Sequence, residues 1–252
     1  MDAFERRFVA LLDVPSAYFH AKAGRVKSFI KLQGILVDLF IQAEQSAKKK
    51  VTRDKKGRKV LYTRMNKALY GHIMSGRLFW EHLSLTLVNL GFVANPDDLC
   101  ILNKEINGCL CTVVLHVDDI KMSHVEERVV REVASQLEVT YGPMELRCDD
   151  VLHYCGLTLD YREDGCVKIG AEDHILETLH EFPEDVGQPR KTPATKRLFE
   201  VNETCEKLDE GRRKMFHSTF AKLLWIGKKA RPDILVALSF LGKRTEKADQ
   251  DD

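Results

Sequence analysis

The feature that most constrains this fold is an apolar segment that ends in two adjacent carboxylates. Residues 110–117 are mostly strand formers, and Asp118 and Asp119 follow directly. This pattern predicts a buried central strand. The chain turns apolar again at Ile120 and Met122, which predicts a hairpin with the two acids at its tip. Neighbouring carboxylates beside a buried strand repel each other and resist desolvation, so we expect a counter-charge, most naturally a divalent cation.

A second apolar segment, residues 8–12, ends at another acid, Asp13, and Pro15 then forces the chain to turn. The two strand ends could bring Asp13, Asp118 and Asp119 to one edge of a sheet. Magnesium prefers oxygen ligands and is usually held by one or two carboxylates plus substrate phosphates, so these acids suit phosphoryl or nucleotidyl transfer. The residues alone leave open a surface turn without function.

The rest of the chain mixes helical and strand patterns. We expect a charged hairpin around 54–58, a core-facing helix over 77–90 stopped by Gly91, and a hairpin turn at Asn107-Gly108. A capping box of Ser123 and Glu126 should start the next helix, which has Val125, Val129, Val133 and Leu137 on one face. A second hairpin should follow, with strands 152–161 and 166–169, and then helices over about 172–182, 215–230 and 234–243. The pattern over 24–42 is ambiguous, and residues 246–252 are expected to be disordered.

Charge is balanced overall, with 39 Lys and Arg against 38 Asp and Glu, but it is unevenly distributed. Residues 48–67 hold ten basic residues and a single acid, Asp54, whereas residues 126–185 are rich in acids. The asymmetry predicts a basic face that could meet phosphates. A charged surface hairpin without a partner is the alternative.

Seven cysteines occur without any Cys-x-x-Cys pair. The odd count, together with the lack of a signal peptide and of an apolar run of transmembrane length, predicts reduced thiols in an intracellular protein that does not cross a membrane. A zinc site at Cys109 and Cys111 is not favoured, because the usual ligand spacings are absent.

Six short segments stand out in a fixed order: Asp13–His20, Asn66–Gly71, Leu115–Asp119, Tyr154–Leu159, Lys191–Ala194 and Lys229–Ile234. Their order and separation resemble the reverse transcriptase of copia-type retrotransposon polyproteins, over nearly the whole chain. The last three are similar to that family's primer-grip hairpin, Thr-Pro loop and Thr-Arg-Pro-Asp motif. The resemblance implies an α+β architecture with a polymerase palm over 1–165. This palm would have a small antiparallel sheet, packed helices and a basic insertion at about 45–67. A mainly helical thumb or connection region would follow over 166–245.

The resemblance also implies roles for individual residues. Asp13 and Asp118 would be the principal ligands of two Mg²⁺ or Mn²⁺ ions, helped by the carbonyl of Val14 and completed by Asp119. Tyr18 matches the aromatic gate against a ribose 2′-hydroxyl, although a core tyrosine is the alternative. The nucleotide pocket would further include Tyr70, Gly71 and Met74. Contacts to the RNA or DNA template-primer would come from Lys55, Lys56, Arg58, Lys59, Arg64 and Lys67.

The implied activity is RNA-directed DNA polymerisation, in which the primer 3′-hydroxyl attacks the α-phosphate of a dNTP. Two positions depart from the family pattern: His116 stands where Tyr is usual, and Met74 where Gln is usual. The family's fingers, RNase H and integrase segments are also missing, so we expect a polyprotein fragment with weak activity or none. The intact element would work in a cytoplasmic virus-like particle. The alternatives are a catalytically silent remnant that binds nucleic acid through its basic face, and a different metal-dependent phosphotransferase.

Overall fold

The computed structural model describes residues 1–24, 27–183, 187–188, 191–195, 197–202 and 204–251. The chain forms two compact units, Met1–Asp149 and Asp150–Asp252. The sequence placed this division at residue 165. A boundary there would separate strands β11 (Leu157–Asp160) and β12 (Lys168–Gly170), which pair in one sheet.

The first unit contains a six-stranded antiparallel sheet with the strand order β5-β6-β7-β8-β1-β9. Its strands are β1 (Phe8–Asp13), β5 (Val93–Ala94), β6 (Ile101–Ile106), β7 (Cys109–His116), β8 (Asp119–His124) and β9 (Glu145–Arg147). The predicted hairpins are confirmed: β6 and β7 are joined at Asn107-Gly108, and β7 and β8 at Val117-Asp118. The apolar strand β7 is therefore internal to the sheet, as its composition predicted.

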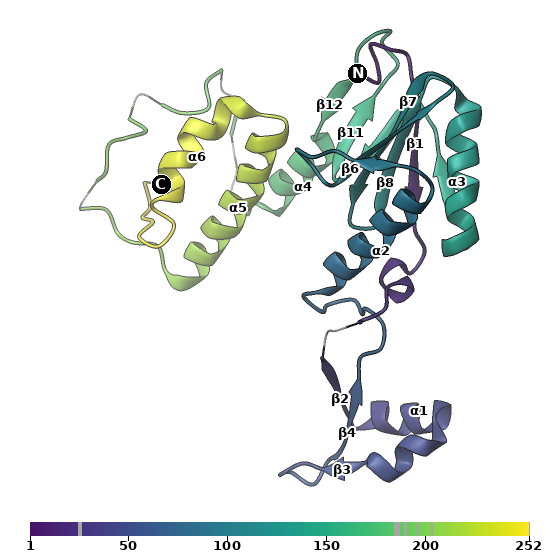
Figure 1. Ribbon diagram of the computed structural model, residues 1–252. Coiled ribbons are helices and arrows are strands. Elements are labelled where there is room, and N and C mark those ends of the chain that lie inside the picture. Colours follow the sequence, from purple (N-terminus) through teal and green to yellow (C-terminus); the bar gives the residue numbers. More distant parts are fainter. Residues whose placement is uncertain (25–26, 184–186, 189–190, 196, 203, 252) are drawn as a thin grey trace. The chain divides into compact units, whose positions relative to one another are not determined.

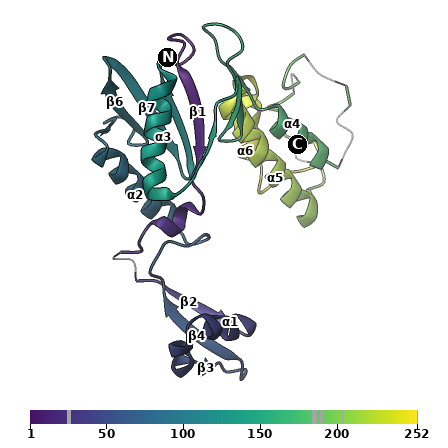
Figure 2. The same ribbon diagram turned by 90° about the vertical axis from the view of Figure 1, so that its right-hand side faces the viewer.

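Two helices, α2 (Ser75–Asn89) and α3 (Glu127–Tyr141), share one hydrophobic core with the sheet. Figure 2 shows α3 crossing the sheet beside β1 and β7. The predicted helix over 77–90 is confirmed, and it ends before Gly91, whose φ of 89° the glycine tolerates. The largest core side chains are Phe79, Phe92, Leu83, Leu87, Leu102, Ile120, Met122 and Leu137.

The predicted capping box at the start of α3 is wrong. Glu126 occupies the N-cap position but makes no side-chain cap bond, and it accepts instead from Asn107 Nδ2 at 3.2 Å. Ser123 belongs to β8, where its Oγ donates to Asp2 at 2.8 Å. Val129, Val133 and Leu137 are buried as predicted, whereas Val125 precedes the helix and is exposed.

Residues 27–67 form a small sheet of their own, with strand order β2-β4-β3 (Figure 1). Its elements are β2 (Phe29–Gln33), α1 (Ile35–Ala43), the 3₁₀ helix η2 (Gln45–Lys50), β3 (Thr52–Arg53) and β4 (Lys59–Arg64). The predicted hairpin around 54–58 is confirmed as the β3–β4 connection. The ambiguous region 24–42 thus holds a strand and a helix. They close on a core of Val37, Ala47 and Leu61.

The second unit combines a three-stranded sheet with helices. Its elements are β10 (Val151–Tyr154), β11, β12, α4 (Glu172–Glu181), α5 (Glu210–Lys229), η3 (Pro232–Ile234) and α6 (Leu235–Gly242). The strand predicted over 152–161 is two strands, because Cys155 and Gly156 adopt φ values of 52° and 75° and reverse the chain. The three predicted helices are confirmed, and their assignment to a thumb stays a prediction.

The predicted disorder of residues 246–252 is wrong for 246–251. Ala248 is 2% exposed, and its carbonyl accepts from the Leu208 backbone N–H at 3.0 Å. Asp249 is buried and accepts from Arg244 Nη2 at 2.6 Å. The segment is polar, so its own composition gave no sign that it docks.

Two further expectations concern the whole chain. None of the seven cysteines forms a disulfide, which agrees with the predicted reduced thiols. None of the helices that the structure describes is both long and apolar enough to cross a membrane.

Deleting residues 246–252 should lower the free energy of unfolding of the second unit by about 2 kcal/mol. The deletion removes the two backbone hydrogen bonds that join the segment to Glu206 and Leu208, and the charge-assisted bond between Arg244 and Asp249. Urea unfolding of the full-length and shortened chains measures the difference. Glu246→Ala, at an exposed position of the same segment, should change little. Equal stability of the two chains would show that the segment contributes nothing.

Candidate functional site

Two of the three acids singled out in the sequence, Asp13 and Asp119, lie in one row across the sheet. Asp13, the last residue of β1, is directly opposite Asp119, the first residue of β8. His116 is opposite Asp119 on the β7 side, and Glu145 is opposite Asp13 on the β9 side. Opposite residues of a pleated sheet project from the same face. We call these four residues, His116, Asp119, Asp13 and Glu145, the acidic row.

The acidic row lies on the sheet face opposite the helices. Leu12 and Ile120, the chain neighbours of Asp13 and Asp119, are opposite each other and buried in the core. Side chains alternate along a strand, so the acids project from the other face. Asp118 is in the β7–β8 turn and is half-buried. The hydrophobic core thus fixes which way the acids point.

Burial and neighbouring like charges together disfavour ionisation of Asp119. Burial raises the pKa of Asp119, and the charges of Asp118 and Asp13 raise it further. His116 and Arg147 act in the opposite direction. Among the described residues, none forms an ion pair with Asp13, Asp118 or Asp119. Arg147 pairs with Glu145 at 3.6 Å, and Lys121 in the next row pairs with Asp2.

The β7–β8 turn is strained. Val117, the first residue of the two-residue connection, has a φ of 57°. A β-branched residue in the left-handed region is a genuine outlier, because its Cβ comes too close to the following carbonyl oxygen. Strain of this kind tends to occur at functional sites, where the surrounding structure enforces it. Here the paired strands β7 and β8 hold the turn that carries Asp118.

An aromatic cluster lies beside the acids. Tyr18, in the 3₁₀ helix η1 (Ala17–His20), has a pKa raised by burial and then by the negative charge of Asp118. Its ring centroid is 4.4 Å from that of Tyr70, which in turn is 6.0 Å from that of Phe19. Tyr18 therefore lies near Asp118, and its role as an aromatic gate stays a prediction. Val14 is 2% exposed and its side chain belongs to the core.

The segment that carries Tyr70 is fixed by a buried serine. Ser75, the first residue of α2, donates through Oγ to the Leu69 carbonyl at 2.7 Å and accepts from the Leu69 N–H at 2.9 Å. Gly71 has a φ of 86°, which the glycine tolerates. Met74 lines a separate groove of about 700 Å³ with His20 and residues of α2. No contact among the described residues joins Gly71 or Met74 to the acids.

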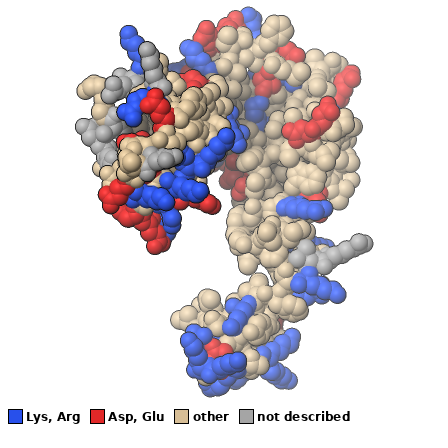
Figure 3. Space-filling model, turned by 90° about the vertical axis from the view of Figure 1, so that its left-hand side faces the viewer, with Lys and Arg blue, Asp and Glu red and all other residues tan. Residues whose placement is uncertain are grey.

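The basic candidates lie on or near the β3–β4 hairpin, apart from the acidic row in the chain. Figure 3 shows Lys and Arg gathered over the part formed by α1 and β2–β4. Two of the candidates already form ion pairs: Arg58 with Asp54 at 2.8 Å and Lys59 with Asp38 at 2.7 Å. The others form no ion pair with any residue that the structure describes: Lys55, Lys56, Arg64 and Lys67.

The acid cluster has the chemistry of a magnesium site but lacks a complete protein cage. Within the described ranges, no three His, Cys, Asp or Glu side chains are grouped closely enough to hold an ion by themselves. Magnesium usually keeps several waters and binds one or two carboxylates plus phosphates. Asp13 and Asp119, opposite each other and without a cationic partner among the described residues, fit that smaller requirement.

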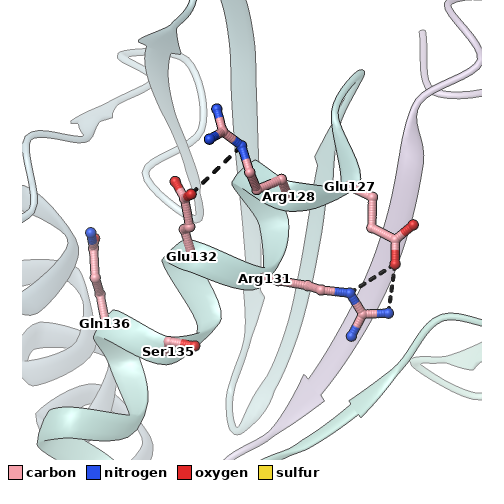
Figure 4. Close-up of a pocket in the computed structure, with 6 residues that line it drawn as sticks. All are labelled: Glu127, Arg128, Arg131, Glu132, Ser135 and Gln136. Atoms are coloured by element: carbon pink, nitrogen blue, oxygen red, sulfur yellow. Dashed lines mark hydrogen bonds and ion pairs between the residues drawn. The ribbon is translucent and has the colours of Figure 1, made fainter.

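A surface hollow on α3, drawn in Figure 4, is lined by Glu127, Arg128, Arg131, Glu132, Ser135 and Gln136. All six belong to one helix. Its charges are paired along the helix, Arg131 with Glu127 at 2.6 Å and Arg128 with Glu132 at 3.7 Å. We assign it no function.

Three residues of the site were not predicted from the sequence. Glu145 and Arg147 belong to the three-residue strand β9, which is too short to show alternation and joins the row only by pairing with β1. Ser75 fixes Leu69 through its buried side chain. The sequence indicated this role only by a serine at the start of a helix.

Comparison with known proteins finds a sequence relative among transposon proteins. No protein-family model matches the chain. A putative transposon Ty5-1 protein of Saccharomyces cerevisiae is 23% identical over 177 residues, which cover 69% of this chain and 56% of the relative. The chain thus spans just over half the length of that curated relative.

Solved structures of telomerase from Candida tropicalis also match. The apo structure gives a TM-score of 0.41 at 13% identity, covering 95% of this chain and 41% of that one. The structure in complex with a fragment of telomeric RNA gives a TM-score of 0.39 at 12% identity, covering 95% of this chain and 38% of that one. Scores this low do not establish a shared fold, and we draw no conclusion from them.

Val117→Gly should raise the free energy of unfolding by about 1 kcal/mol, because glycine adopts the positive φ without the steric cost that valine bears. Val117→Ala is the matched control: it removes the same methyl groups but keeps a Cβ, so it should not stabilise. Urea unfolding of both variants measures the effect. Equal stabilities of the glycine and alanine variants would contradict a strained turn.

Asp119→Asn should stabilise the metal-free protein by up to about 1 kcal/mol, since it removes one of two like charges that face each other across paired strands. Well below the ordinary carboxyl pKa of 3.8, Asp119 is protonated in both the folded and the unfolded state. Its charge therefore does not affect the free energy of unfolding at that pH. As pH rises through the raised folded-state pKa of Asp119, the native state gains a repelled charge and the wild type loses stability relative to the variant. Unfolding curves from acid to neutral pH measure this; a difference independent of pH would refute it.

Proposed function

We propose that this chain is the palm-containing part of a transposon reverse transcriptase, which transfers a nucleotide from a dNTP to a primer 3′-hydroxyl on an RNA template. The observation that carries the proposal is that Asp13 and Asp119 lie opposite each other on neighbouring strands, with Asp118 in the adjoining turn and Tyr18 near enough to feel its charge. Two carboxylates on one sheet face and a third beside them, none with a cationic partner among the described residues, suit a cation-dependent reaction of phosphates.

In the proposed site, Asp13, Asp118 and Asp119 would hold Mg²⁺ or Mn²⁺, with help from the carbonyl of Val14. Such ions stabilise charge that develops on phosphate oxygens and activate an attacking hydroxyl. The acids' own contribution is a fixed placement, since strand pairing and the core behind Leu12 and Ile120 determine their positions. Preorganised charge of this kind is usually the largest contribution to catalysis.

The aromatic cluster would bind the incoming nucleotide. Tyr18 lies beside Asp118 and against Tyr70, so its ring could meet the sugar of a nucleotide whose phosphates face the acids. Ser75 would act as a positioning residue, because it fixes Leu69 and thereby Tyr70. The unpaired cations of the basic hairpin would meet the template-primer backbone, a contact that weakens with salt.

The similarity to a transposon protein supports a mobile-element origin, and in an intact element the chain would work inside a cytoplasmic particle. The copia-type lineage, the two-ion mechanism and the dNTP substrate belong to this proposal. A catalytically silent remnant is the second candidate. It is favoured by the incomplete ligand group among the described residues and by Met74, which faces a groove apart from the acids.

Primer extension on poly(rA)/oligo(dT) with Mg²⁺ or Mn²⁺ tests the proposal. Asp118→Asn should lower extension at least about a hundredfold, because metal-assisted charge stabilisation is worth several kcal/mol. Asp97→Asn, an exposed carboxylate in the loop before β6, is the matched control and should extend like the wild type. Equal extension by wild type and Asp118→Asn would overturn the catalytic assignment.

A further inference from the structure

We propose that the outer face of the β2-β4-β3 sheet is a stacking surface for single-stranded nucleic acid, separate from the acidic row. The proposal goes beyond polymerisation, since it requires neither catalysis nor the acids. It rests on the pairing register of β2 and β4, on the exposure of their side chains and on the charge around them.

Register divides this small sheet into two faces. Leu32 and Leu61 are opposite each other and pack on the core beneath α1. The alternate positions therefore project from the outer face. There Phe29 is opposite Arg64, and the next outward pair places Lys31 opposite Tyr62.

The outer face is unusual because its two aromatic side chains are not covered. Phe29 is 66% exposed and Tyr62 is 56% exposed. Lys31 and Arg64 are exposed as well, and neither forms an ion pair with a residue in the described part of the chain. Two rings and two cations thus alternate diagonally on one sheet face. We call Phe29, Lys31, Tyr62 and Arg64 the aromatic-basic face.

The charge of residues 27–67 indicates which kind of partner the aromatic-basic face would bind. Residues 27–67 contain twelve Lys and Arg against three Asp and Glu, and two of those acids, Asp38 and Asp54, are already paired within the segment. A polyanion is therefore the expected partner. Exposed rings on a basic sheet stack with unpaired bases, which a duplex does not offer. The partner that satisfies both features is a single strand, whose bases stack on Phe29 and Tyr62 while its phosphates meet Lys31 and Arg64.

Fluorescence anisotropy of the full 252-residue chain with labelled oligothymidylate, oligouridylate and a duplex of equal length tests this proposal. The double variant Phe29→Ala/Tyr62→Ala should lose about tenfold or more in affinity for single strands, because each stacked base contributes measurably to binding. Its affinity for the duplex should not change. Tyr62→Phe keeps the ring and should bind like the wild type.

Two further variants separate stacking from charge and from folding. Ile35→Ala/Leu39→Ala removes equally exposed apolar side chains of α1, which packs on the other face, and should leave affinity unchanged. Lys31→Gln/Arg64→Gln should lower the affinity for single strands and reduce the slope of log affinity against log salt concentration by about 1.4. Circular dichroism confirms that each variant is folded.

The proposal is overturned if Phe29→Ala/Tyr62→Ala binds single strands like the wild type, or if the α1 control loses as much affinity. It is also overturned if sedimentation shows a dimer that the ring variant alone dissociates, since the face would then meet a second copy of the chain. None of these outcomes depends on primer extension, so failure here and failure of the polymerase assignment are distinguishable.

Discussion

The pairing of β1 with β8 is the interaction on which the candidate site depends. It places Asp13 opposite Asp119 and Leu12 opposite Ile120 in adjacent positions of the same ladder. A shift of one residue would turn the acids into the core and the apolar side chains out to solvent, which burial forbids. The hydrophobic effect that secures Leu12 and Ile120 therefore also holds two like charges face to face. The fold tolerates this repulsion because the core behind it is large.

The two faces of the main sheet divide stability from chemistry. One face packs on α2 and α3 and buries the large apolar side chains. The other carries the acidic row, the strained turn at Val117 and the neighbouring charges of Lys121 and Arg147. Two local rules are broken at this second face: a β-branched residue, Val117, has a positive φ, and carboxylates lack cationic partners among the described residues. Such violations are expected where function opposes stability.

The small sheet of residues 27–67 repeats this division on a smaller scale. Its inner face closes on Val37, Ala47 and Leu61, and its outer face carries Phe29, Lys31, Tyr62 and Arg64. A core of this size contributes little stability. Phe29 and Tyr62 lie outside it, so packing does not explain why these rings are exposed. Both sheets thus present polar or mixed side chains on one face, acidic in one case and basic in the other. Nucleic-acid chemistry needs both kinds of surface.

The sequence by itself determined the strands that end in Asp13 and Asp118-Asp119, the hairpin between β7 and β8, the helix α2 and the buried face of α3, because apolar periodicity and turn residues are local signals. It misjudged the start of α3, where Ser123 and Glu126 bind Asp2 and Asn107 instead of capping the helix. Only the tertiary structure decided that Glu145 joins the acidic row, that residues 246–251 dock, and that Phe29 and Tyr62 share one face. These depend on strand pairing between distant segments, and pairing partners are not encoded in any single stretch of the chain.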